Sequence, residues 1–292
     1  MKIINPIYDQ AFKYLMENKA AAKKIISVIT EEEILRLELS NIETTIEDPV
    51  RYLKILRMDF KAQIRTAENR KKTVLIELQK CQEPTDIIRF RRYLGKTYAG
   101  IDVSGKSKKK SKEATEPYPI LAIYFLGYNI PGINTSGVIV DNKVIDSITK
   151  QTLKVNSEFI NLLNHKSYII QIDRLRKERK TRLEKLLNLF DQSRITDDKY
   201  VLDVENIDIE FFDIAEHLQK VIMDDEFRRK LELQEYVDIK FGKVEKELID
   251  AKDKIKEKEK TIEDRDKTLS EKDKALTEKD KIIEDLRRKL KK

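Results

Sequence analysis

The stretch KTVLIELQK, residues 72–80, carries the pattern that decides the fold. It is rich in apolar and β-branched residues and is short enough to be a single strand. Because strand side chains alternate between two faces, Leu75, Glu77 and Gln79 share one face, and the apolar residues between them share the other. An apolar strand is therefore predicted to place a carboxylate and an amide side by side.

A second strand-like run precedes this stretch at residues 52–64, and the polar TAENR separates the two. Two such runs around a short polar segment predict a β-hairpin. A turn centred on Glu68 pairs residues whose numbers add up to 136, which sets Asp59 opposite Glu77. A shift of one residue would move the two carboxylates to opposite faces, so this register decides whether they meet.

Apolar residues at spacings of three and four predict helices on either side of the hairpin. These helices are expected at residues 7–30, 84–99 and throughout 157–241. In the helix at 84–99, Arg89, Arg92 and the neighbouring Tyr93 could contact phosphates or simply face solvent.

Strands are expected from continuous apolar runs without strict alternation. Residues 119–128 fit a buried strand, and residues 138–150 fit a further strand. Residues 34–46 fit a strand and a short amphipathic helix equally well. The lysine-rich segment 100–118 is expected to be a surface loop.

The last fifty residues have a different pattern, because apolar residues recur at every seventh position among Lys, Glu and Asp. The companion core positions are mostly basic, for example Lys258, Arg265 and Lys272. We therefore expect a coiled-coil helix over residues 243–292 that forms only a weak homodimer. The seven apolar positions are Leu248, Ile255, Ile262, Leu269, Leu276, Ile283 and Leu290.

Composition narrows the function classes. The 292 residues are 40% apolar and 39% charged, with a net charge of +7, which allows a polyanionic partner. The single cysteine, Cys81, cannot form an intramolecular disulfide, and a cytoplasmic location is expected. Neither a membrane-spanning run nor a nucleotide-binding fingerprint is recognisable, so we expect no membrane and no nucleotide cofactor.

An Asp and a Glu that face each other across a hairpin can hold one divalent cation. Mg²⁺ takes oxygen ligands and commonly uses one or two carboxylates together with a phosphate. Such an ion polarises a phosphodiester and activates water. On spacing alone, Asp59 and Glu77 could equally be charges on a solvated strand face.

Five motifs together resemble the PD-(D/E)XK nuclease superfamily, and in particular its branch of recombination-promoting nucleases and transposases. In chain order the motifs are DQAFKYLM (9–16), RMDF (57–60), VLIELQ (74–79), RFRRYLGKTYA (89–99) and YPILAIYFLG (118–127). The order and spacing of these motifs carry the resemblance more than any one of them does.

The resemblance implies roles for individual residues. Asp59 and Glu77 would bind Mg²⁺ or Mn²⁺, and Gln79 would stand where the wider superfamily has a catalytic lysine. Asp9 would be an auxiliary site residue, although a capping role at a helix start is an alternative. Met58 departs from the family pattern, which has proline there.

The implied function is that of a metal-dependent DNA endonuclease in recombination or mobile DNA. The alternative is a catalytically weak DNA-binding or coiled-coil scaffold protein. We expect an α/β fold with a restriction-endonuclease-like mixed sheet flanked by helices, followed by a C-terminal coiled-coil helix. The predicted domains are a nuclease-like core at 1–155, a helical extension at 156–242 and the coiled coil at 243–292.

Overall fold

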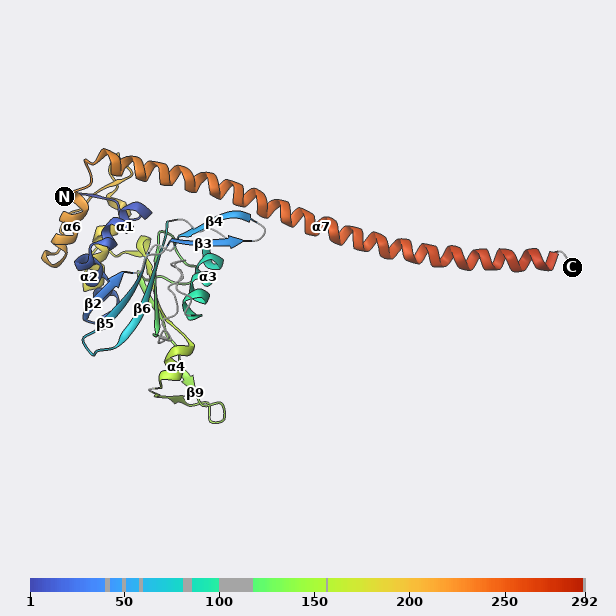
Figure 1. Cartoon of the computed structure of the whole chain (residues 1–292), viewed down its shortest axis with the longest axis horizontal. Coiled ribbons are helices and arrows are strands. Elements are labelled where there is room, and N and C mark those ends of the chain that lie inside the picture. The colour runs from blue at the N-terminus through green and yellow to red at the C-terminus, as the bar shows by residue number, and fades with distance from the viewer. Residues whose placement is uncertain are drawn as a thin grey trace, which may run out of the picture. The chain divides into compact units, whose positions relative to one another are not determined.

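A mixed sheet of six strands, with helices on both faces, organises the first part of the chain (Figure 1). The computed structural model describes residues 1–39, 43–48, 51–57, 60–80, 86–99, 118–155 and 157–290. The strand order is β2 (Ile34–Leu39), β5 (Phe60–Thr66), β6 (Lys71–Gln79), β7 (Ile120–Leu126), β11 (Lys166–Gln171) and β8 (Gly137–Val140). The three strands β6, β7 and β11 are parallel, and the others are antiparallel to their neighbours. The predicted α/β class and mixed sheet are confirmed.

Strand β6 lies inside this sheet, and both of its faces are buried. Val74, Ile76 and Leu78 belong to the large core formed with α1 (Asp9–Glu17) and α2 (Lys19–Thr30). On the other face, Leu75 packs with apolar residues of α3 (Asp86–Tyr98). Figure 1 shows α1 and α2 on one side of the sheet and α3 on the other. The predicted alternation along β6 and the predicted helix at 84–99 are therefore confirmed.

The hairpin between β5 and β6 has the predicted register. Phe60 pairs with Ile76 and Lys61 with Leu75, so the residue numbers of each pair add up to 136. The described pairs end at Phe60. Asp59 lies outside the described residues, and its position opposite Glu77 stays a prediction.

The single strand predicted at 52–64 is wrong, because two strands in two different sheets occupy this run. β4 (Arg51–Arg57) pairs with β3 (Glu43–Asp48) in a separate two-stranded sheet. β5 then joins the six-stranded sheet at Phe60. The alternation of apolar and polar residues runs from Leu56 to Ile64 without a break at the change, so only the long-range pairing reveals it. The segment 34–46, whose sequence fits a strand and a short helix equally well, forms strands and no helix among its described residues.

The helix predicted at 7–30 is interrupted at Asn18. The backbone of Asn18 is extended, with φ −72° and ψ 100°, and ends α1. Its side-chain Oδ1 accepts hydrogen bonds from the backbone N–H groups of Ala20 (3.1 Å) and Ala21 (3.2 Å), which begins α2. The apolar spacing continues through this break because both helices bury their faces in the same core.

Substitution of Asn18 by Ala is expected to lower the free energy of unfolding by about 1 kcal/mol. The reason is that two N–H groups in the first turn of α2 lose their acceptor. Chemical denaturation measures the change, with the exposed loop variant Asn142→Ala as the control. Equal stability of the two variants would mean that the cap contributes nothing.

The prediction of a wholly helical region at 157–241 is wrong. Residues 166–171 form β11 inside the six-stranded sheet, and β12 (Val201–Asp203) pairs with β1 (Lys2–Ile4). The short apolar run 168–170 fits a strand or part of a helix, and pairing with β7 decides in favour of the strand. Before the final helix, which begins at Asp225, the helical elements here are α4 (Glu158–Leu163), η1 (Ile172–Arg174), α5 (Arg182–Leu187), η2 (Asn188–Phe190), η3 (Gln192–Arg194), η4 (Ile209–Phe211) and α6 (Phe212–Gln219).

The chain divides into two compact units, residues 1–232 and 233–292. The residues 156–232 thus belong to the same unit as the residues before them. The predicted buried strand at 119–128 is β7, and the run at 138–150 forms β8 and the short β9 (Val144–Ile145), which pairs with β10 (Thr152–Leu153).

The final helix, α7 (Asp225–Leu290), is 66 residues long and contains the whole described part of the predicted coiled-coil segment. The predicted long C-terminal helix is therefore confirmed. Within the described residues, every helix is too short or too polar to span a bilayer.

Candidate functional site

Glu77 is a carboxylate buried in the middle of the sheet. It lies in β6 and its relative exposure is 0%. Strand alternation places it on the same face as Leu75 and Gln79, toward α3. A buried carboxylate carries a desolvation cost, so such residues are rare and are often functional.

Tyr124 of β7 is the cross-strand neighbour of Glu77 in the sheet. Its ring packs against that of Phe90 in α3, with the centroids 4.4 Å apart. Burial, and secondly the negative charge of Glu77, raise the pKa of the Tyr124 hydroxyl far above its ordinary value. Tyr124 therefore keeps its proton at neutral pH and can act as a hydrogen-bond donor next to the carboxylate.

Gln79 lies two residues further along the same face and is held in place. Its Oε1 accepts a hydrogen bond of 2.8 Å from the hydroxyl of Tyr128, which follows β7. The backbone N–H of Gly127 also donates to the carbonyl of Gln79, at 2.8 Å. A Cβ on Gly127 would lie 2.6 Å from the carbonyl oxygen of Lys80, so this close approach of the two strands requires glycine.

Lys80 lies on the opposite face from Gln79. Its Nζ is 3.9 Å from the centroid of the Tyr8 ring, immediately before α1. Asp9 is the first residue of α1, which covers the face of the sheet opposite to Glu77. The amino end of α1 thus meets the carboxyl end of β6, while Glu77 and Gln79 point toward α3.

The structure brings together two of the predicted site residues, Glu77 and Gln79. Asp59 is outside the described residues, and of Arg89, Arg92 and Tyr93 only the helical backbone of α3 is described. Across the residues whose placement is described, no cluster of three or more His, Cys, Asp or Glu side chains could hold a metal ion.

Tyr124 and Tyr128 are the neighbours of the site that sequence reasoning missed. Both lie in the apolar run 119–128, which was interpreted only as a buried strand. Their even spacing within that strand region was the available signal, but the pairing of β7 with β6 was needed to connect them to Glu77 and Gln79.

No family model, curated protein or solved structure matches this chain. The resemblance to the PD-(D/E)XK superfamily therefore rests on the five sequence motifs alone. Independently of any relative, the geometry consists of a buried carboxylate, an oriented amide and two tyrosines at the junction of β6 and β7.

Proposed function

We propose that this chain is a metal-dependent DNA endonuclease whose active site includes Glu77. The burial of this carboxylate in β6, on the same face as Gln79, is the observation that carries the proposal. The register of the hairpin supports it, since continuing the pairing by one residue would set Asp59 opposite Glu77. The mixed sheet with helices on both faces agrees with the restriction-endonuclease-like fold that the motifs imply.

The side chains at the site fit a divalent cation in their chemistry. The carboxylate of Glu77, and that of Asp59 if the register continues, are oxygen donors of the kind that Mg²⁺ or Mn²⁺ takes. The metal ion, when bound, would polarise the phosphodiester and lower the pKa of a bound water molecule. Gln79, with its Oε1 engaged by Tyr128, can offer its amide N–H groups to a phosphate or to water.

The test is nicking of supercoiled plasmid by the purified full-length protein in Mg²⁺, in Mn²⁺ and in EDTA. The proposal expects nicking with either cation and none in EDTA. Nicking that persists in EDTA, or no nicking under any of these conditions, would contradict it. A role in recombination or mobile DNA, within the cytoplasm, belongs to the same proposal and follows from the motifs.

A scaffold function is the second candidate, and the surface of α7 favours it. Its heptad positions Ile255, Ile262, Leu269, Leu276 and Ile283 are 47–58% exposed. A lone helix with such a stripe is held mainly by ion pairs between its own turns, such as Lys267 with Glu263 at 3.5 Å, each worth about 0.2–0.5 kcal/mol. Self-association would bury the stripe.

Deletion of residues 243–292 is expected to reduce the mass measured by light scattering from that of a weak dimer to that of a monomer. The full-length double variant Ile262→Gln/Leu269→Gln should do the same, because it removes two apolar layers. The matched variant Lys260→Gln/Lys267→Gln changes positions two residues before each of these and should leave the dimer intact. A full-length chain that stays monomeric at high concentration would rule out the dimer.

A further inference from the structure

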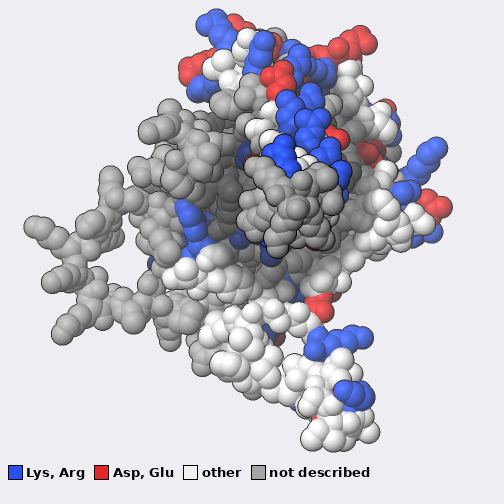
Figure 2. Space-filling model, turned by 90° about the vertical axis from the view of Figure 1, so that its right-hand side faces the viewer, with Lys and Arg blue, Asp and Glu red and all other residues white. Residues whose placement is uncertain are grey.

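A groove of about 810 Å³ lies at the end of the sheet opposite to Gln79. Its walls include the first residues of three parallel strands, Lys71 of β6, Ile120 of β7 and Lys166 of β11. The hairpin of β9 and β10 and the helix α4 complete it. Figure 1 shows these elements beyond the lower end of the sheet, and in Figure 2 this part of the molecule carries basic groups among mostly uncharged ones.

The lining of the groove is strongly basic. Of the described residues that line it, Asp141 alone carries a carboxylate, and six carry a basic side chain. Carboxylates already pair with half of these six: Glu68 with Arg70, Glu32 with Lys72 and Asp141 with Lys166. The six basic residues are Arg70, Lys71, Lys72, Lys143, Lys154 and Lys166.

The other three cations are available to a ligand. Lys71, Lys143 and Lys154 are exposed, and none of them forms an ion pair within the described part of the chain. Lys71 comes from β6, whereas Lys143 and Lys154 come from segments that flank the hairpin of β9 and β10. The Nζ of Lys71 donates to the hydroxyl of Tyr118 at 3.3 Å, and this partner is neutral.

Helix α3 connects this groove with the candidate active site. Its first turns follow β6 in the chain. Its last turn reaches the residue before β11, because the hydroxyl of Tyr98 is 2.8 Å from Nδ1 of His165. Between these ends, Phe90 and Leu94 pack on the same sheet face as Leu75. The basic residues of α3 therefore lie on an element that runs from the level of Glu77 to the groove.

We propose that the groove binds the phosphate backbone of duplex DNA at a distance from the cleavage point. Lys71 and Glu77 are six positions apart in β6, which corresponds to about 20 Å along a strand. At about 3.4 Å per base pair, this distance equals about six base pairs of duplex. Lysines that converge from separate elements suit a repeating polyanion, and the choice of DNA as that polyanion rests on the proposed function.

The test is the binding of a short fluorescent DNA duplex to the full-length protein, measured by anisotropy in EDTA over a series of salt concentrations. The variant Lys71→Gln/Lys143→Gln/Lys154→Gln should weaken binding by at least about tenfold at low salt. It should also reduce the slope of log K against log salt by about 2.7, because each phosphate contact contributes about 0.9.

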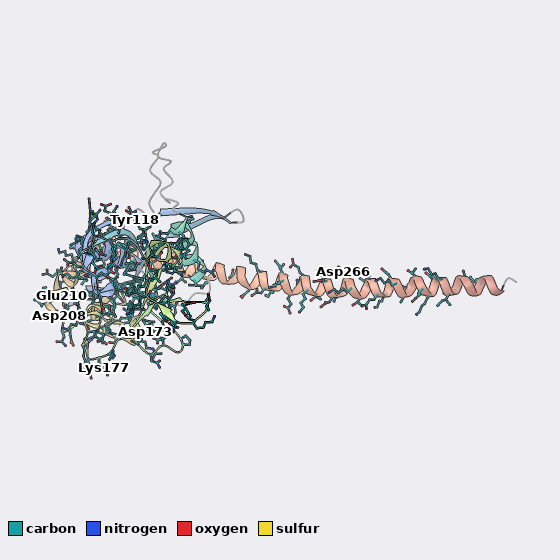
Figure 3. The ribbon with its side chains drawn as sticks, turned by 90° about the horizontal axis from the view of Figure 1, so that it is seen from below. Tyr118, Asp173, Lys177, Asp208, Glu210 and Asp266 are labelled. Atoms are coloured by element: carbon teal, nitrogen blue, oxygen red, sulfur yellow. The ribbon has the colours of Figure 1, made fainter. Side chains whose placement is uncertain are left out.

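The control variant Lys19→Gln/Lys177→Gln/Lys220→Gln removes the same charge from exposed lysines outside the groove. Lys177 lies on the opposite side of the body from Tyr118 (Figure 3). The groove proposal would be overturned if the two triple variants lowered the affinity for DNA equally, or if the unaltered protein did not bind DNA. Competition by polyglutamate as strong as that by DNA would also overturn it, in favour of an acidic polypeptide.

The groove and the nuclease site can fail separately. If only the groove variant lost DNA binding and the unaltered protein did not nick DNA, the groove proposal would stand and the endonuclease proposal would be rejected. If the unaltered protein nicks DNA and the groove variant binds DNA as tightly as the unaltered protein does, the endonuclease proposal would stand and the groove proposal would be rejected.

Discussion

Nicking of supercoiled DNA is expected to fall at least about a hundredfold when Glu77 is replaced by Gln or Asp59 by Asn. Both substitutions keep the shape of the side chain and remove a carboxylate that is proposed to hold the divalent ion. Because the two carboxylates would share one ion, the double variant should lose little more than either single variant. Plasmid nicking in Mg²⁺ measures all three proteins.

Two controls accompany this experiment. Glu38→Gln removes an exposed carboxylate from the edge strand β2 and should retain full activity. Circular dichroism and thermal melting check that the Glu77 variant is folded, because its side chain is buried. Full activity in both single variants at Asp59 and Glu77 would place the catalytic site elsewhere.

Substitution of Phe125 by Ala is expected to lower the free energy of unfolding by about 3–5 kcal/mol. Phe125 lies in β7 with 0% exposure, and its ring packs against Phe190 (centroids 5.2 Å apart) and Phe12 (5.4 Å). Truncation would leave a cavity where the sheet meets α1 and η2. Guanidinium denaturation measures the loss as a lower midpoint at an unchanged slope.

Phe159→Ala is the matched control, because this ring is 71% exposed in α4. Its cost should stay within about 0.5 kcal/mol. If Phe125→Ala were as stable as the control, the contact between β7, α1 and η2 would contribute little to the folded state.

Several features of the protein could be predicted from the sequence because they depend on local pattern. Alternation along KTVLIELQK placed Glu77 and Gln79 on one face of a strand, and the short polar segment around Glu68 set the register of the hairpin. The apolar run of β7 predicted a buried strand, and the heptad pattern of residues 243–292 predicted the charged C-terminal helix, which the structure begins earlier, at Asp225. Each of these features is determined by residues that are close together in the chain.

Apart from the hairpin of β5 and β6, the tertiary structure alone decided which strands share a sheet. The run 52–64 is strand-like throughout and alternates without a break from Leu56 to Ile64, yet β4 pairs with β3 and β5 pairs with β2 and β6. The apolar segment of β11 could have continued a helix until β7 and β8 provided its pairing partners. Such choices depend on contacts between segments that are distant in the chain, and local periodicity does not report these contacts.

The surroundings of the candidate site were likewise a product of tertiary structure. Tyr124 lies beside Glu77, and Tyr128 beside Gln79, only because β7 pairs in parallel with β6. The two strands are separated in the chain by helix α3. The basic groove arises because the three parallel strands begin at the same edge, which brings Lys71 together with lysines from the β9 and β10 region. The sequence by itself determined the chemical groups and their strand faces, and long-range strand pairing decided their neighbours.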